Sequence, residues 1–260
     1  MLVAEDIQTG IERKYAAVAH DLRQELKLAA EVQSDLLPPT PPLTAIGGLA
    51  AKSLPARAVG GDFYEFLRYS TKRKSAGAIG DATGKGIAAA IYAAMVAGII
   101  RTLAQRELGA AEMLKELNNV LLRRPVQGRF ISLIYATWDF RERRLQIANS
   151  GLPYPIYVHE GQISSVEATG LPVGVFRNTE YEEVGLICAP GDILVFFTDG
   201  ITDAQDKYGK EFGRSRLEEL VALHANDSAQ EVVNSIFARV AQHSRGMETF
   251  DDQSVVVIRT

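Results

Sequence analysis

Residues 80–86, Gly-Asp-Ala-Thr-Gly-Lys-Gly, constrain the fold of this chain more than any other stretch. An apolar run ends just before them, and an Ala- and Ile-rich run over 87–100 follows. The glycines allow backbone conformations that are closed to other residues. This order predicts a strand, a tight turn and a helix, with Asp81 at the strand's end. A plain helix entry capped by Asp81 or Thr83 is the alternative, whereas the spacing of a Walker phosphate loop is absent.

The composition narrows the class of protein. Hydrophobic residues make up 47% and charged residues 23% of the 260 positions, which indicates a globular protein with an ample core. The net charge is -4 and no dense basic cluster occurs, so we expect no nucleic-acid partner. Cys188 is the single cysteine, which excludes an internal disulfide and a thiolate zinc site. The chain opens without a secretory segment and the 87–100 run is short for a bilayer, so we expect a cytoplasmic protein without a membrane partner.

The N-terminal arm carries a heptad-like apolar stripe within a helix expected over 10–37. The stripe positions are Ile11, Tyr15, Val18, Leu22, Ala29, Val32 and Leu36, interrupted at Glu25. About four heptads favour a coiled coil, and an amphipathic helix lying on its own domain is the alternative. Prolines at 38, 39, 41 and 42 end the helix. We therefore expect a linker helix over 1–37, a proline-rich connector over 38–46 and a folded domain over 47–260.

Beyond the connector, the pattern predicts short strands and two pairs of helices. Strands are expected over 49–54, 63–69, 76–80, 130–138, 145–149, 156–159, 163–166, 181–187, 192–198 and 254–258. Helices are expected over 87–106, 110–124, 214–224 and 228–243. The 130–138 strand is apolar on both faces, so both faces should be covered, and 145–149 should be its hairpin partner. Helices grouped between hairpin strands predict antiparallel sheets covered by helices, rather than an alternating parallel fold.

Acidic residues adjoin four of the apolar strands. Asp62 precedes one strand, Asp81 and Asp199 each end one, and Asp251 and Asp252 precede the last. An acid beside a buried strand needs hydrogen bonds, basic partners or metal ions. Each acid could cap its own turn, but four such places, three beside glycine, favour a shared site. Oxygen ligands without histidine select Mg²⁺ or Mn²⁺, and a carboxylate shared by two such ions suits phosphate-ester hydrolysis.

The pattern resembles the PPM (protein phosphatase 2C-like) metal-dependent serine/threonine phosphatases, specifically their bacterial SpoIIE-like branch. The resemblance runs from about residue 30 to the C-terminus, and several ordered motifs make it specific. The matching stretches are 32–38, 59–66, 80–86, 148–153, 198–204 and 251–254. The resemblance implies an α/β (α+β) fold, an α-β-β-α sandwich of two antiparallel sheets flanked by helices. Its metals would lie at one end of the sandwich.

The resemblance also implies a set of metal ligands. Asp81 would bridge two ions, and the backbone carbonyl of Ala82 would complete the shell of one. Asp199 and Asp251 would hold the other ion. Asp62 would contact the second metal directly or through water. The implied cofactor is a binuclear Mn²⁺ or Mg²⁺ centre, to which a third ion can be added.

Other matched residues would surround the ions or the phosphate. Asp252 would act through hydrogen bonds rather than as a ligand, beside Gly61 and Gly200. Arg57 stands where many relatives place a phosphate-binding arginine, and its guanidinium fork suits a phosphate. An exposed loop arginine without that role is the alternative.

The chain departs from the family pattern at two positions. Leu152 replaces the histidine of the usual Asn-Ala-Gly-His-Pro stretch, and Thr83 stands where eukaryotic relatives have a histidine proposed as general acid. Protonation of the leaving oxygen therefore has no assigned side chain, which leaves a water on the metal as the default. Neither departure removes an expected metal ligand.

The resemblance implies a phosphatase that hydrolyses phosphoserine or phosphothreonine by metal-activated water, without a covalent phosphoenzyme. Its substrate would be a phosphorylated STAS-domain anti-sigma-factor antagonist in a partner-switching pathway. The N-terminal helix and the helices after Lys85 would form a homodimer that reports a signal from an upstream sensor. One alternative is a catalytically silent scaffold, which predicts missing carboxylates although none is missing. Another is a diguanylate-cyclase-like protein with a Gly-Gly-Asp signature at 60–62, which requires an acid where Phe63 stands.

Overall fold

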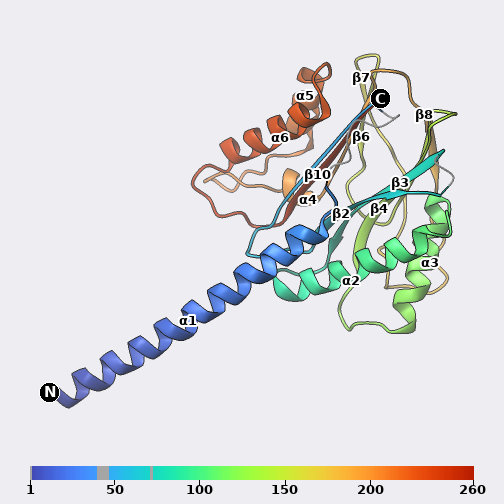
Figure 1. The fold of residues 1–260 in the computed structure, drawn as a ribbon. Helices are drawn as coiled ribbons and strands as arrows, with labels where there is room; N and C mark the ends of the chain where they lie inside the picture. Colours follow the sequence, from blue (N-terminus) through green and yellow to red (C-terminus); the bar gives the residue numbers. More distant parts are fainter. Residues whose placement is uncertain (1, 40–46, 71–72) are drawn as a thin grey trace.

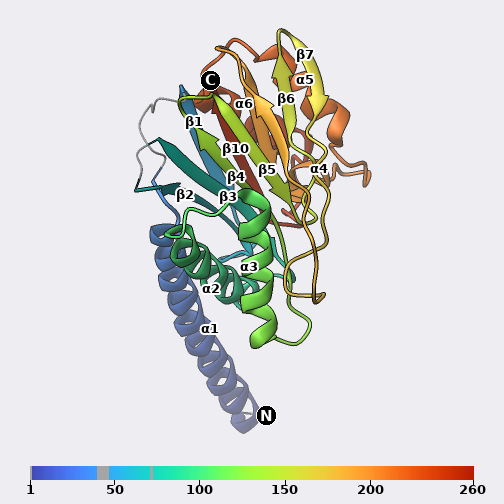
Figure 2. The same cartoon turned by 90° about the vertical axis from the view of Figure 1, so that its right-hand side faces the viewer.

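A computed structural model describes residues 2–39, 47–70 and 73–260 of the chain. One long helix, α1 (Leu2–Leu36), projects from a body of two stacked sheets with helices on both outer faces (Figures 1 and 2). The expected proline connector and the basic turn at 70–74 lie partly outside the described residues.

The body contains two five-stranded antiparallel sheets. The strands are β1 (Gly48–Leu54), β2 (Asp62–Arg68), β3 (Lys74–Ala82), β4 (Ile131–Asp139), β5 (Arg144–Asn149), β6 (Ile156–His159), β7 (Gln162–Ser165), β8 (Val184–Ile187), β9 (Ile193–Phe197) and β10 (Gln253–Arg259). The order is β1-β10-β9-β6-β7 in the first sheet and β2-β3-β4-β5-β8 in the second. Hairpins build most of the second sheet, as the sequence predicts, because β2 pairs with β3 and β4 pairs with β5 across short connections.

Two pairs of helices cover the sheets. Helices α2 (Ile87–Ala104) and α3 (Ala110–Arg123) pack on the second sheet, and α5 (Arg214–Leu223) and α6 (Ala229–His243) cover the first. A one-turn helix, α4 (Asp199–Thr202), follows β9. The arrangement confirms the expected α-β-β-α sandwich.

Strand β4 shows how the layers are filled. Leu133 and Tyr135 are fully buried against the helices α2 and α3. Ile134 and Trp138 point the other way and pack in the layer between the two sheets. Successive side chains of a strand face opposite sides, so an apolar strand covered on both sides was the correct prediction.

Some element boundaries differ from the expectation. Helix α1 begins at Leu2 rather than near residue 10, because no proline interrupts the preceding residues and a single glycine is tolerated in a helix. Strand β8 begins at Val184 rather than 181. The backbone amide of Glu182 donates to the Thr169 carbonyl, and its side chain accepts hydrogen bonds from the amide and hydroxyl of Thr169.

The apolar stripe of α1 faces solvent. Tyr15 is 73% exposed and Val32 is 61% exposed. Val18 and Leu22 are also more than half exposed. Helix α1 contacts the body near its C-terminal end, beside α2. A helix lying on its own domain would bury this stripe, so that alternative is wrong for the described side chains.

Helix α2 is the one helix in the described ranges that is long and apolar enough to cross a membrane by length and composition. The apolar run over 87–100 is short for a bilayer, but the helix continues to Ala104 and has 18 residues. Ala89, Val96 and Ile100 are fully buried in the layer between α2 and the second sheet. Core helices pass the same test, so this feature assigns no membrane role.

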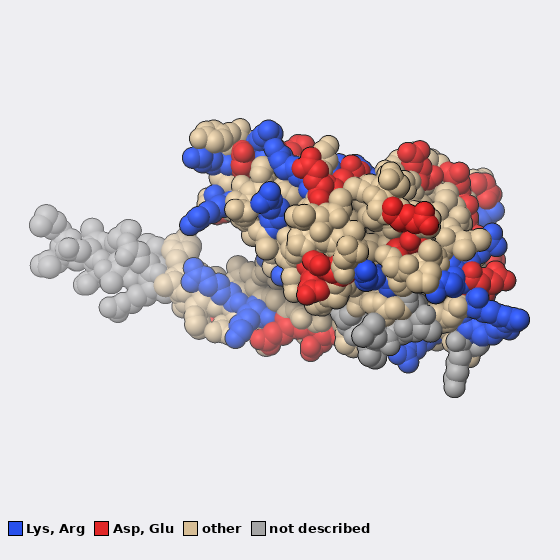
Figure 3. Space-filling model, turned by 90° about the horizontal axis from the view of Figure 1, so that it is seen from above, with Lys and Arg blue, Asp and Glu red and all other residues tan. Residues whose placement is uncertain are grey.

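Charges are mixed on the molecular surface. Lys and Arg side chains are interspersed with Asp and Glu side chains over the face seen from above (Figure 3). This face offers no continuous basic field for a polyanion, in keeping with the net charge of -4.

Candidate metal centre

The strand ends that carry the acids meet at one end of the sandwich. Asp62 at the start of β2 lies opposite Asp81 near the end of β3 in an antiparallel pair. Asp199 follows β9, and Asp251 precedes β10, which pairs with β9 in the other sheet. The hydroxyl of Thr198 donates a 2.8 Å hydrogen bond to Oδ2 of Asp62 and so joins the two sheets. The structure therefore brings together acids that are up to 189 residues apart (251 minus 62).

Asp62 is almost fully enclosed, with 5% of its surface exposed. Burial raises its pKa well above the ordinary value, and the charge of Asp81 raises it further. The hydrogen bonds from Thr198 and Ser254 act in the opposite direction. Thr198 is fixed in turn, because its hydroxyl oxygen accepts a 3.0 Å hydrogen bond from the amide of Ser254. Sequence reasoning gave Thr198 no role, although it immediately precedes Asp199.

Asp81 lies among several other carboxylates. The pKa of Asp81 is raised to about 7, first by burial and then by the charges of Asp199, Asp251 and Asp252. The ammonium group of Lys85 lowers the pKa, but not enough to cancel these effects. A divalent cation placed among these carboxylates would favour their charged forms.

Asp252 acts through hydrogen bonds. Its carboxylate accepts one from the amide of Ala56 at 2.7 Å and one from the amide of Gly61 at 2.6 Å. A Cβ atom at Gly61 would lie 2.6 Å from the carbonyl oxygen of Ala82, and one at Gly200 would lie 2.0 Å from that of Asp252. Both positions need glycine because backbone occupies the space. The carbonyl oxygen of Ala82 therefore lies close to Gly61, on the side where any other residue would carry its Cβ atom.

Lys85 contacts one of the expected metal ligands. Its Nζ lies 3.0 Å from Oδ2 of Asp251 and 3.6 Å from the centre of the Phe250 ring, and it donates a hydrogen bond to the Phe250 carbonyl. Sequence reasoning did not assign this residue to the site. Its position as the single basic residue of 80–86 was the available signal.

Two arginines flank the turn at 80–86. The side chain of Arg57 passes beside Gly86, 3.7 Å from the place of a Cβ there, and makes no ion pair with any other described residue. Arg129 donates a hydrogen bond to the Thr83 carbonyl. The Thr83 hydroxyl both donates to and accepts from the backbone of Phe130, at 3.1 and 3.0 Å. This pairing leaves the hydroxyl as a structural group and not a free proton donor.

The end of α1 is tied to the same region. The side-chain amide of Gln33 donates to the Gly60 carbonyl at 2.7 Å and accepts from the Gly60 amide at 3.0 Å. Arg101 on α2 donates to the Leu36 carbonyl and to the carboxylate of buried Glu65, each at 2.6 Å. Gln33 stands in one of the stretches that match the family, but its contacts could not be predicted, since nothing near it in the sequence indicates a partner 27 residues away.

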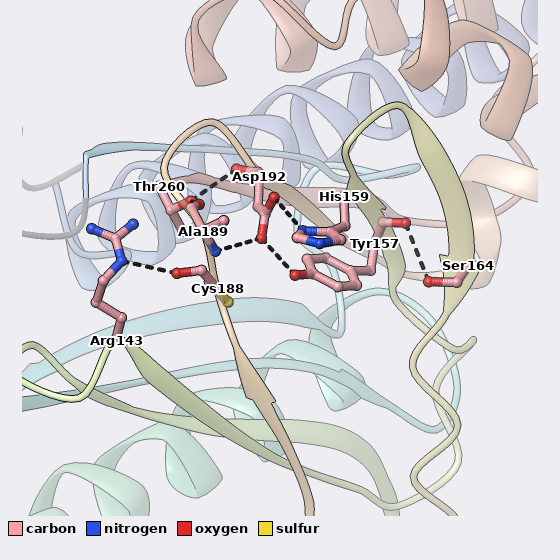
Figure 4. Close-up of polar contacts among 8 residues, drawn as sticks. All are labelled: Arg143, Tyr157, His159, Ser164, Cys188, Ala189, Asp192 and Thr260. Atoms are coloured by element: carbon pink, nitrogen blue, oxygen red, sulfur yellow. Dashed lines mark hydrogen bonds and ion pairs between the residues drawn. The ribbon is translucent and has the colours of Figure 1, made fainter.

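An acid at the opposite end of β9 shows how this protein stabilises a structural carboxylate. Asp192 is 3% exposed and accepts hydrogen bonds from the Tyr157 hydroxyl at 2.5 Å and the Ala189 amide at 2.7 Å, with Nδ1 of His159 at 2.9 Å (Figure 4). In the described part of the chain, no side chain donates to the carboxylates of Asp81 or Asp199. Hydrogen bonds therefore stabilise the carboxylate of Asp192. The carboxylates of Asp81 and Asp199 receive no such side-chain hydrogen bonds from the described residues.

The donor set fits hard divalent cations. It consists of carboxylates and one backbone carbonyl, which are the ligands Mg²⁺ and Mn²⁺ prefer. Across residues 2–39, 47–70 and 73–260, no three acidic, cysteine or histidine side chains already stand at the spacing of a closed metal site. The assignment to metals therefore rests on donor chemistry, the glycine-lined backbone and the raised pKa of Asp81.

Comparison with known proteins defines the class. The chain is similar to the SiaA-PP2C domain of Pseudomonas aeruginosa (TM-score 0.84, 20% identity, 94% of this chain and 99% of that chain). It is also similar to the PP2C phosphatase domain with a regulatory fragment of SpoIIE from Bacillus subtilis (TM-score 0.71, 21% identity, 82% and 63%). The fold is thus that of the PP2C-type phosphatase domains. At these identities the structures establish the fold.

Sequence comparison gives the family. The model of stage II sporulation protein E (SpoIIE) matches residues 71–260, so the chain belongs to the SpoIIE family of PP2C-type phosphatases. A curated relative is the phosphoserine phosphatase RsbU of Bacillus subtilis strain 168, 28% identical over 93% of this chain and 72% of that protein. The resemblance stated from the motifs is confirmed, and the Gly-Gly-Asp cyclase alternative has no support in this fold.

Proposed function

We propose that the chain hydrolyses phosphoserine or phosphothreonine on a regulatory protein, with a binuclear Mn²⁺ or Mg²⁺ centre. The observation that carries the proposal is the meeting of acids from four strand ends around Asp81, whose pKa is raised to about 7. When bound, the cations would activate water and neutralise charge on the phosphate. A silent scaffold is disfavoured because every expected carboxylate is present.

Each residue of the centre has a proposed task. Asp81 would bridge the ions, with the Ala82 carbonyl, Asp199 and Asp251 completing their shells. Asp62, held by the Thr198 hydroxyl, would contact an ion directly or through water. The donor chemistry described above supports these assignments.

Arg57 is the proposed phosphate-binding residue. It lies beside Gly86 and makes no ion pair with the rest of the described chain. Its five donors could hold two phosphate oxygens at once. Asp252 would keep the ligand loop in place through its hydrogen bonds to Ala56 and Gly61.

The decisive experiment measures hydrolysis of a phosphoserine protein with Mn²⁺. We expect activity in the wild-type chain, none in excess chelator and none in Asp81→Asn. Activity that survives either treatment would refute the mechanism. Metal titration by calorimetry separates an enzyme from a scaffold, because a scaffold would show no tight divalent site.

The proposed substrate is a phosphorylated STAS-type protein of a partner-switching pathway in the cytoplasm. The relative RsbU is named a phosphoserine phosphatase, which supports a phosphoserine substrate. A panel of purified phosphoproteins tests it: selective dephosphorylation of a STAS-domain protein is the expected result, and equal rates on unrelated phosphoproteins would contradict it.

We also propose that the chain forms a homodimer through α1 and α2, under an upstream sensor. The supporting observation is that both helices expose apolar residues, including Ile91 (66%) and Met95 (41%) on α2. The proposed division is a linker helix over 1–37, a connector over 38–46 and a phosphatase domain over 47–260. Equal oligomeric states for the full chain and a chain that starts at Pro38 would refute the helical dimer.

A further inference from the structure

A loop over 171–176 is held rigidly beside α3. Asn118 of α3 is 1% exposed, and its side chain accepts a hydrogen bond from the Gly174 amide and donates one to the Phe176 carbonyl, both at 2.8 Å. The Thr179 hydroxyl donates to the same carbonyl at 3.0 Å. Figures 1 and 2 both show the segment running alongside α3. A buried amide that fixes two backbone groups specifies one loop conformation.

The loop lies at the metal end of the sandwich. Val173 and Ile131 exchange two backbone hydrogen bonds, of 2.9 and 3.0 Å, and Ile131 pairs with Ala82 across β4 and β3. Neighbouring strands are about 4.8 Å apart, so Val173 lies about 10 Å from the Ala82 carbonyl. An extended peptide covers this distance in about three residues.

The loop presents apolar side chains to solvent. Leu171 is 50%, Val175 39% and Phe176 51% exposed, whereas Gly174 between them adopts a φ of 92° and packs toward Tyr92. These three exposed residues are named the apolar rim. Exposed apolar side chains on a loop of fixed backbone conformation, close to the candidate metal centre, are typical of an interaction surface rather than of a plain turn.

The charge beside the apolar rim indicates the partner. Arg177 follows Phe176, is exposed and forms no ion pair with another described residue. A guanidinium at the border of an apolar patch favours a partner with an acidic side chain next to an apolar one.

We propose that the apolar rim is the docking surface for the protein substrate. It would take an apolar side chain about three residues from the phosphorylated serine, with an acidic neighbour facing Arg177. The inference rests on the proposed phosphatase function and deepens it, because it assigns recognition of the protein segment to residues outside the metal centre. Phosphate chemistry and peptide docking would then be separable.

The test uses the full chain with Mn²⁺ and short phosphoserine peptides. Each peptide carries one Leu and one adjacent Glu at a varied distance from the phosphoserine, or Ala at both places. The small substrate p-nitrophenyl phosphate measures the chemistry alone. We expect the wild-type chain to prefer one Leu–Glu position by about tenfold in kcat/KM. Phe176→Ala should abolish that preference through KM while hydrolysis of p-nitrophenyl phosphate stays unchanged.

Two controls keep the outcomes distinct. Leu223→Ala removes a 78% exposed apolar residue from the helices of the other sheet and should change neither substrate. Peptide binding to the Asp81→Asn chain, followed by fluorescence polarisation, should be weakened by Phe176→Ala even without turnover. Equal rates on all peptides, or equal binding with and without Phe176, would overturn the docking surface. Absence of any Mn²⁺-dependent hydrolysis would instead overturn the proposed function, and the binding comparison would still decide the docking surface.

Discussion

Replacing Asp81 by Asn should stabilise the metal-free protein while removing its response to metal. The carboxylate of Asp81 has a pKa raised to about 7, against an ordinary value of 3.8. Between these two pH values the folded state binds a proton that the unfolded state does not. The free energy of unfolding therefore falls as the pH rises from about 4 to about 7, and the cost is fully present above pH 7. Asn is neutral at every pH and avoids this cost.

The size of the effect follows from the two pKa values. Each pH unit between them corresponds to about 1.4 kcal/mol, which gives about 4 kcal/mol. Asp81 is only partly buried by surface area, so solvent screening lowers the expected gain to about 2–4 kcal/mol at pH 8. At pH 4 the gain should be close to zero.

Urea unfolding in chelator measures this difference directly. The single tryptophan, Trp138, is 3% exposed in the layer between the sheets and reports unfolding by fluorescence. Addition of Mn²⁺ should reverse the order, because ions that bind only the folded wild-type centre stabilise it by mass action. An Asn variant less stable than wild type in chelator at pH 8, or a gain that does not change with pH, would refute the electrostatic account.

Three further predictions concern residues outside the ligand set. Arg101→Met should lower the free energy of urea unfolding by about 2 kcal/mol, because Glu65 is buried and loses its cation. The double variant that adds Glu65→Gln should recover most of this loss. A double variant that stays equally destabilised would indicate lost packing instead. Gln33→Ala removes two hydrogen bonds and should cost about 1–2 kcal/mol while speeding proteolytic release of α1; unchanged proteolysis would show that the clamp does not hold the helix. Asp192 raises the pKa of His159, so this pair's stabilisation is complete below about pH 6.5 and is lost as the pH rises through the higher folded-state pKa. Thermal unfolding of His159→Gln should therefore depend less on pH across that window, and identical pH profiles would contradict it.

The sandwich could be predicted from the sequence because its evidence is local. Apolar alternation, glycine turns and a strand apolar on both faces describe the layers without knowledge of partners. The candidate ligands could also be selected from local sequence, since each stands at a strand end. Contacts over long separations were not predictable: nothing near Asp62 in the sequence indicates that Thr198, 136 residues away, donates to it.

The two acids of β9 show this limit most clearly. Asp192 and Asp199 flank the same apolar strand and look equivalent in the sequence. Their roles differ because Tyr157 and His159 on the adjacent β6 satisfy Asp192, whereas Asp199 has no such neighbour among the described side chains. Strand order, and not local composition, separates a structural acid from a candidate ligand.

Helix α1 has the dimensions of a lever whose fulcrum lies beside the metal centre. Its 35 residues span about 52 Å at 1.5 Å per residue, and Gln33 stands about 5 Å from the C-terminal end. A 10° tilt about that end would move the far tip by about 9 Å but shift Gln33 by less than about 1 Å. A shift of that size is enough to lengthen the 2.7 Å hydrogen bond to Gly60 beyond its effective range. A large movement of the N-terminal end of α1 would thus become a small movement of Gln33, next to the loop that precedes Asp62.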